Sequence, residues 1–216
     1  MARADRRLAI ALTIVALAIA AASHAASQGG RHPMRIALIV DTSAATASVL
    51  QLLRPAVIAL VDAVPADADL LLVSAGRRAQ VRVPPTTDHA RIKSSVQGLV
   101  ADGGPTPLID ALLEIDDRFM KKAADRWPVY VIITGDGSES SRTEGDVFSN
   151  WLTTLAARHV SGHAVVIKTG NGLPESIARA VTQAAPGHFE TVSGGNVEKA
   201  LKSLGTLIAE EYDRAR

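Results

Sequence analysis

Side chains that carry oxygen stand at three separated points of the sequence. Asp41 and Ser43 follow the apolar run at residues 35–40, Thr106 stands in a glycine-proline turn, and Asp136 stands between two glycines. Carboxylates and hydroxyls together make an all-oxygen site, which suits Mg²⁺, Mn²⁺ or Ca²⁺ better than zinc. These residue types therefore predict a divalent-cation site if the fold brings them together.

Unbroken apolar runs indicate the strands that must position these side chains. A strand buried on both faces of a parallel sheet needs a continuous Ile/Leu/Val run, without alternation. Such runs, separated by segments of helical periodicity, stand at residues 35–40, 69–74, 129–134 and 164–168, and residues 188–192 are expected to form a last short strand. The alternating segment 79–83 follows a short turn and predicts an antiparallel edge strand that ends at Pro84-Pro85. The sequence therefore predicts an α/β fold with a doubly wound, mostly parallel, Rossmann-like central sheet, whose carboxyl edge binds ligands.

Local signals give more detailed expectations for the helices and one loop. Pro55 lies inside a helical pattern and predicts a kink there or a helix that restarts at that residue. Asp88 is a candidate cap for the next helix, and Thr106 is a candidate cap for a helix that Pro107 opens. The polar stretch at residues 138–146 is expected to be a mobile surface loop.

The first 30 residues have the pattern of a secretory signal. Three arginines precede an apolar run at residues 8–22, which is short for a membrane span, and small residues precede a cleavage point after Ala25. We predict a signal peptide at residues 1–25, or alternatively an uncleaved N-terminal anchor, then a linker at 26–33 and one domain at 34–213. Either alternative places the folded part outside the cytoplasm: secreted, periplasmic or at the cell surface.

Composition excludes several classes of function. The net charge is +1, so no strong attraction to nucleic acid is expected. The chain has no cysteine, which excludes disulfides, thiolate metal sites and cysteine nucleophiles. Contact with a membrane is expected only through an uncleaved N-terminal segment.

The segments IVDTSAA, GGPTPLIDALL and VIITGDG together resemble the von Willebrand factor type A (vWA) family. That family has a metal-ion-dependent adhesion site made of a D-x-S-x-S turn, a later Thr and a later Asp. The resemblance implies that Asp41, Ser43 and Thr106 hold the cation directly and that Asp136 acts through water. It also implies a non-enzymatic binding module, whose protein partner completes the coordination with an Asp or Glu.

One departure from the family pattern concerns the second serine of D-x-S-x-S, which is Ala45 here. Alanine cannot coordinate a cation, so water, Thr46 or Ser48 would have to fill the gap. Mg²⁺ should be weakened most, because it tolerates distorted geometry poorly.

Simpler interpretations stand beside the cation site. Asp41 and Thr106 alone would each be explained as helix caps, and Asp136 alone as a turn residue. Two other functions therefore stay open: a metal-independent vWA scaffold in a surface or envelope assembly, and a hydrolase or phosphotransferase that uses Asp41. Catalysis is the less favoured of these, because no nucleophile elbow or phosphate-binding loop accompanies Asp41.

Overall fold

A computed structural model describes residues 32–168 and 172–215 of the chain. The predicted signal peptide and the residues at 169–171 lie outside the described residues. The strands are β1 (Met34–Asp41), β2 (Asp69–Ala75), β3 (Ala79–Thr86), β4 (Trp127–Gly135), β5 (Ser161–Ile167) and β6 (Phe189–Val192). The α-helices are α2 (Leu50–Ala63), α3 (His89–Gln97), α4 (Leu108–Ile115), α5 (Gly145–Ala156), α6 (Leu173–Ala184) and α7 (Val197–Arg214). No helix in these ranges is long and apolar enough to cross a membrane.

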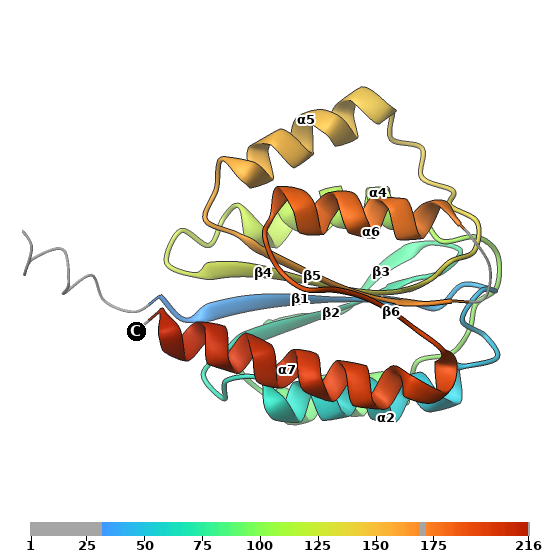
Figure 1. Cartoon of the computed structure of the whole chain (residues 1–216), viewed down its shortest axis with the longest axis horizontal. Helices are drawn as coiled ribbons and strands as arrows, with labels where there is room; N and C mark the ends of the chain where they lie inside the picture. The colour runs from blue at the N-terminus through green and yellow to red at the C-terminus, as the bar shows by residue number, and fades with distance from the viewer. Residues whose placement is uncertain (1–31, 169–171, 216) are drawn as a thin grey trace, which may run out of the picture. The chain divides into compact units, whose positions relative to one another are not determined.

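The strands form one six-stranded sheet in the order β3-β2-β1-β4-β5-β6. All neighbouring pairs are parallel except β2 and β3, so the predicted antiparallel edge strand is confirmed. The chain moves from β1 to β2 in one direction and later resumes on the other side of β1 with β4. This reversal makes a topological switch point between β1 and β4, where open α/β sheets bind ligands. The carboxyl ends of the parallel strands lie at the right in Figure 1.

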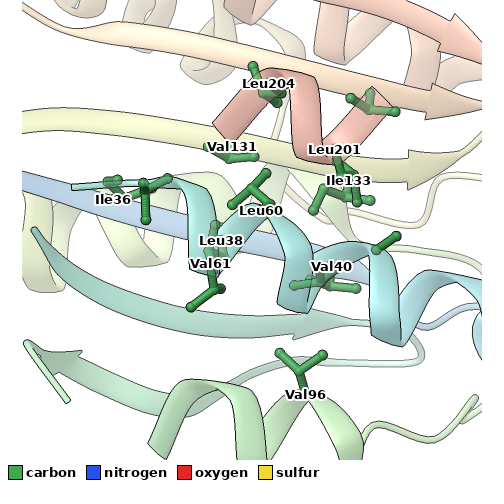
Figure 2. Close-up of a cluster of buried hydrophobic side chains, with 14 of the residues drawn as sticks. Ile36, Leu38, Val40, Leu60, Val61, Val96, Val131, Ile133, Leu201 and Leu204 are labelled. Carbon is green, nitrogen blue, oxygen red and sulfur yellow. The ribbon is translucent and has the colours of Figure 1, made fainter. Parts of the chain in front are cut away.

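Each face of the sheet is covered by helices and has its own apolar core. Helices α2 and α7 cover one face, and α4, α5 and α6 cover the other (Figure 1). Figure 2 shows the first core, where side chains of β1 and β4 meet those of α2 and α7. Alternate residues of β1 serve the two faces: Leu38 belongs to one core and Ile39 to the other. Burial on both faces explains why these strands are continuous apolar runs.

Two local expectations differ from the structure. Helix α2 runs without a restart through Pro55, so that alternative is wrong. Strand β3 continues through Pro84 and Pro85 to Thr86, with shifts in its register against β2. Proline is tolerated there because β3 is an edge strand, where an N–H is not needed on the open side. The Asp88 cap is confirmed, since its carboxylate accepts a hydrogen bond from the Arg91 N–H at 3.1 Å.

A buried carboxylate, Asp116, lies in the π-helical turn that continues α4 (Asp116–Met120). Its Oδ1 accepts hydrogen bonds from the Tyr130 hydroxyl at 2.6 Å and Arg158 Nη1 at 2.8 Å. Its Oδ2 accepts one from Trp151 Nε1 at 2.7 Å. The arginine balances the charge and the two aromatic donors fill the remaining sites, so this polar cluster links α4, β4 and α5 as a satisfied structural unit.

We expect Asp116→Ala to lower the free energy of unfolding by about 3–5 kcal/mol, because it leaves a partly buried arginine and two buried donors without their acceptor. Urea denaturation at neutral pH measures the loss. The neighbouring Asp117 is exposed, and Asp117→Ala is the matched control, with an expected change within about 0.5 kcal/mol. Equal stability of the two variants would contradict this role.

A second buried ionisable group, His163, lies on β5 under α7. Its Nδ1 accepts a hydrogen bond from the His188 N–H at 3.1 Å, and its Nε2 lies 3.5 Å from Glu211 Oε2. Burial, with a smaller contribution from the charge of His188, lowers the pKa of His163 to about 4. Burial also raises the pKa of Glu211, against opposing effects of Arg214 and His188. The histidine is therefore neutral in the fold at neutral pH.

Stability should fall as the pH drops from about 6.5 to about 4, because the unfolded chain protonates His163 before the folded chain does. Over this pH range, His163 alone should lower the free energy of unfolding by roughly 3 kcal/mol. Glu211 reduces this loss, because it binds its proton more tightly in the folded chain than in the unfolded chain. We expect His163→Asn, which keeps an acceptor for the His188 N–H, to flatten the dependence. Urea midpoints across this pH range measure it. The exposed His159→Asn is the control, and an unchanged slope in His163→Asn would contradict the assignment.

Candidate metal-binding site

The carboxylate of Asp41 is fixed across the switch point at the end of β1. Its Oδ1 accepts a hydrogen bond from the Ser43 N–H at 2.7 Å. Its Oδ2 accepts bonds from the Thr134 hydroxyl and the Gly135 N–H of β4, both at 2.9 Å. The interpretation of Asp41 as a helix cap is wrong, because α2 begins only at Leu50. The side chain instead joins the turn after β1 to the end of β4.

The electrostatic surroundings of Asp41 favour a cation. Burial raises the pKa of its carboxyl, and the bonds from Ser43, Gly135 and Thr134 oppose this only in part. Within the part of the chain that the structure describes, no salt bridge balances its charge. A buried carboxylate without a positive partner is stabilised by a metal ion, which favours the ionised form.

Thr106 reaches the site from the loop before α4. Its hydroxyl donates to the Ala75 carbonyl at 3.1 Å, and the Thr42 N–H donates to the same carbonyl, also at 3.1 Å. The Gly104 carbonyl, in turn, accepts a bond from the Ala44 N–H at 3.0 Å. The prediction that Thr106 caps a helix is wrong, since α4 begins at Leu108 without a side-chain cap. Long-range contacts, which a local pattern cannot reveal, decide its position.

Gly103 and Gly104 allow this loop to turn toward the β1 edge. Their φ angles are +68° and +74°, a left-handed region that residues with a Cβ rarely adopt. The glycine-rich turn seen in the sequence therefore has a conformational cause.

The loop after β4 brings Asp136 to the same edge. The Thr106 N–H donates to the Ser138 carbonyl, and the Ser140 N–H donates back to the Thr106 carbonyl, both at 2.9 Å. Further along, the N–H groups of Arg142 and Thr143 donate to the carboxylate of Asp110 on α4. The loop expected to be mobile is thus anchored by its backbone. Asp136 itself is buried and directly follows the Gly135 N–H that binds Asp41.

A cavity of 660 Å³ opens where the three turns meet. Its lining consists of Ser43, Ala44, Ala45, Gly104, Pro105, Asp136, Gly137 and Ser138. Of the four predicted ligands, Ser43 and Asp136 line it, whereas Asp41 and Thr106 are buried and are not part of its lining. Over residues 32–168 and 172–215, no group of three or more His, Asp or Glu side chains could hold a metal. A cation at this edge would therefore depend on hydroxyl oxygens as well as carboxylates.

The surroundings of Ala45 decide which hydroxyl could replace the missing serine. Thr46 is buried, and its hydroxyl donates to the Asp41 carbonyl at 2.8 Å, so it serves the turn. Ser48 is exposed and does not line the cavity. Ser138 does line it, and the sequence reasoning did not single it out. Ser138 stands two residues after Asp136 in the same turn, and this spacing is the feature of the sequence that could have identified it as a site residue.

Replacement of Thr134 by valine tests the bond that positions Asp41. We expect Thr134→Val, which keeps the shape of the side chain, to lower the free energy of unfolding by about 1.5–3 kcal/mol, because a buried carboxylate loses a donor. Chemical denaturation at neutral pH measures the change. Thr191 on β6 is exposed, and Thr191→Val should have little effect; if the two variants unfold alike, the Thr134 hydroxyl does not support Asp41.

Comparison with known proteins agrees with the geometry. Residues 36–139 match the model of the von Willebrand factor type A domain. A von Willebrand factor type A structure from Catenulispora acidiphila superposes with a TM-score of 0.66 and 16% identity, covering 81% of this chain and 42% of that one. The proximal thread matrix protein 1 of the mussel byssus, in a structure with a zinc-occupied MIDAS motif, superposes with a TM-score of 0.64 and 19% identity, covering 83% of this chain and 46% of that one. The chain thus spans less than half the length of these two proteins. No curated protein is significantly similar to the sequence.

A structure of the manganese-loaded TRAP protein of Plasmodium vivax has a TM-score of 0.58 and 16% identity, covering 83% of this chain and 74% of that one. At such identities the likeness shows the fold alone. Residues 36–139, just under half of the chain, therefore match the von Willebrand factor type A domain, and the mostly parallel sheet has the Rossmann-like fold of that family.

Proposed function

We propose that this vWA domain is a non-enzymatic module that binds a protein partner through a divalent cation at the carboxyl edge of its sheet. Asp41, Ser43 and Thr106 would hold the ion, and Asp136 would act through water. An Asp or Glu of the partner would complete the coordination. vWA domains commonly mediate contacts between proteins, and two of the structural relatives carry zinc or manganese.

The observation that carries this proposal is the joining of three oxygen-bearing turns by hydrogen bonds of the main chain. The Ala44 N–H donates to the Gly104 carbonyl, the Thr106 N–H donates to the Ser138 carbonyl, and the Gly135 N–H donates to the Asp41 carboxylate. Because the main chain ties the turns together, their small polar side chains are arranged before any ligand arrives. Such preorganisation lowers the cost of binding.

Ser138 is the residue that would compensate for Ala45. Both line the same cavity, and Ser138 is exposed there. A hydroxyl oxygen is a suitable ligand for Mg²⁺, Mn²⁺ or Ca²⁺, with water in the remaining positions. The proposal therefore adds Ser138 to the four residues that the sequence suggests.

A metal-independent scaffold is the second candidate, and Ala45 is the observation that favours it. The methyl group of Ala45 packs so closely on the turn after β4 that a Cβ at Gly137 would lie 2.5 Å from it. In this alternative, alanine stands at the position of the ligand serine because its methyl group packs against the turn after β4. The partner then binds without a cation.

Enzymatic use of Asp41 is a weaker candidate. Both of its carboxylate oxygens accept hydrogen bonds from Ser43, Thr134 and Gly135, which suits a positioning role better than nucleophilic attack. We also propose an extracytoplasmic location, supported by the signal-like pattern at residues 1–25.

Thermal unfolding of the purified protein in Mn²⁺ or Mg²⁺ tests the function. Since a ligand that binds only the folded state stabilises it, cation at about 100 times its Kd should add about 2.7 kcal/mol. Asp41→Ala and Ser43→Ala should abolish the response, Ser138→Ala should weaken it, and Ala45→Ser should strengthen it. Asp117→Ala, a carboxylate far along the chain and exposed, is the control.

A melting temperature that responds to neither added cation nor EDTA would favour the metal-independent scaffold. A response that survives in Asp41→Ala would place the cation elsewhere. Both outcomes contradict the proposed site.

A further inference from the structure

A second cleft, of 620 Å³, adjoins the cavity of the candidate cation site. The two share Pro105 in their lining. Arg77 and Arg78 line the second cleft from the turn between β2 and β3, and Arg142 lines it from the loop after β4. We call it the arginine cleft. Three positively charged side chains thus lie beside the candidate metal-ion site, in a chain whose net charge is only +1.

The three arginines are available for a ligand. All three are exposed, and among the described residues none of their side chains has a salt bridge or a side-chain hydrogen bond. Two acids, Asp110 and Glu114, line the same cleft. Asp110 accepts bonds from the Thr143 hydroxyl at 2.6 Å and from two backbone N–H groups, and against the effect of burial these bonds, with a smaller contribution from the charge of Arg142, lower its pKa. Glu114 pairs with Arg118 outside the three arginines. The three arginines outnumber the two acids, and Arg77 and Arg78 have no salt bridge among the described residues, so the cleft has an excess of positive charge.

The arginine cleft is fixed relative to the cation site by one loop. The carboxylate of Asp102 accepts a hydrogen bond from the Arg77 N–H at 3.1 Å and packs against Gly76, where a Cβ would lie 1.6 Å from its Oδ1. The Asp102 N–H donates to the Thr42 carbonyl at 3.1 Å. The turn that bears Arg77 and Arg78 and the turn that bears Ser43 are thus both held by Asp102.

We propose that the arginine cleft recognises acidic side chains that flank the carboxylate bound at the cation. The partner is then a protein segment with several spaced Asp or Glu residues. One of them completes the cation's coordination, and others lie against Arg77, Arg78 and Arg142. This inference rests on the proposed function, and it adds the chemistry of the partner to it. Arginine suits this task because its planar guanidinium pairs with carboxylates in two-point contacts.

Fluorescence anisotropy with two labelled peptides of equal length tests the proposal. One peptide has a single Asp among Gly and Ser residues, and the other has the same Asp followed by three Glu residues. In saturating Mn²⁺ we expect the acidic peptide to bind roughly five to ten times more tightly, as three partly exposed charge pairs would give. The variant Arg77→Gln/Arg78→Gln/Arg142→Gln should remove this advantage and leave the single-Asp peptide unchanged.

A charge-matched variant separates the cleft from a general effect of net charge. Arg91, Lys199 and Lys202 are exposed and lie outside the arginine cleft. Arg91→Gln/Lys199→Gln/Lys202→Gln should keep the advantage of the acidic peptide. An equal loss in both triple variants, no binding of the acidic peptide, or tighter arginine-dependent binding of a single-stranded oligonucleotide would overturn the proposal.

Chelation distinguishes this inference from the function on which it rests. If Mn²⁺ stabilises the protein but the two peptides bind equally, the arginine cleft is refuted and the cation site stands. If the acidic peptide binds as tightly in EDTA and to Asp41→Ala as to the wild type in Mn²⁺, and still depends on the arginines, the arginine cleft is supported and the cation site is refuted.

Discussion

The parallel pairing of β1 with β4 is the constraint on which the site depends. Val40 lies opposite Ile133, and one residue further on the carboxylate of Asp41 meets the Thr134 hydroxyl and the Gly135 N–H. Both faces of these strands are buried, so a slip of one residue would exchange the side chains of the two cores. Packing therefore fixes the register, and the register fixes the position of the carboxylate relative to its donors.

Two buried aspartates show how surroundings separate a structural role from a functional one. Asp116 is balanced by Arg158 and fully supplied with donors, so the fold accounts for it completely. Asp41 is equally well supplied with hydrogen bonds but faces no positive side chain among the described residues, and burial raises its pKa. Of the two, only Asp41 has a negative charge that a ligand could balance. It lies at the carboxyl edge of the sheet, where open α/β folds bind ligands.

The loop from Asp102 to Thr106 organises the surface around that edge. Its backbone binds the turn after β1 and the loop after β4, while Asp102 fixes the turn that carries Arg77. Small residues and two left-handed glycines make these close approaches feasible. One short segment therefore shapes both the cavity at the candidate cation site and the arginine cleft beside it.

The sequence by itself determined the α/β class, the antiparallel edge strand and the candidate residues Asp41 and Asp136. Continuous apolar runs and polar strand ends are local patterns with few structural meanings. Tertiary structure alone decided that Thr106 contacts Ala75 and caps no helix, that Ser138 lines the cavity, and that Asp116 meets Arg158. The partners in each of these relations lie tens of residues apart along the chain. No local pattern encodes such hydrogen bonds, because they form only once packing has set the strands in register.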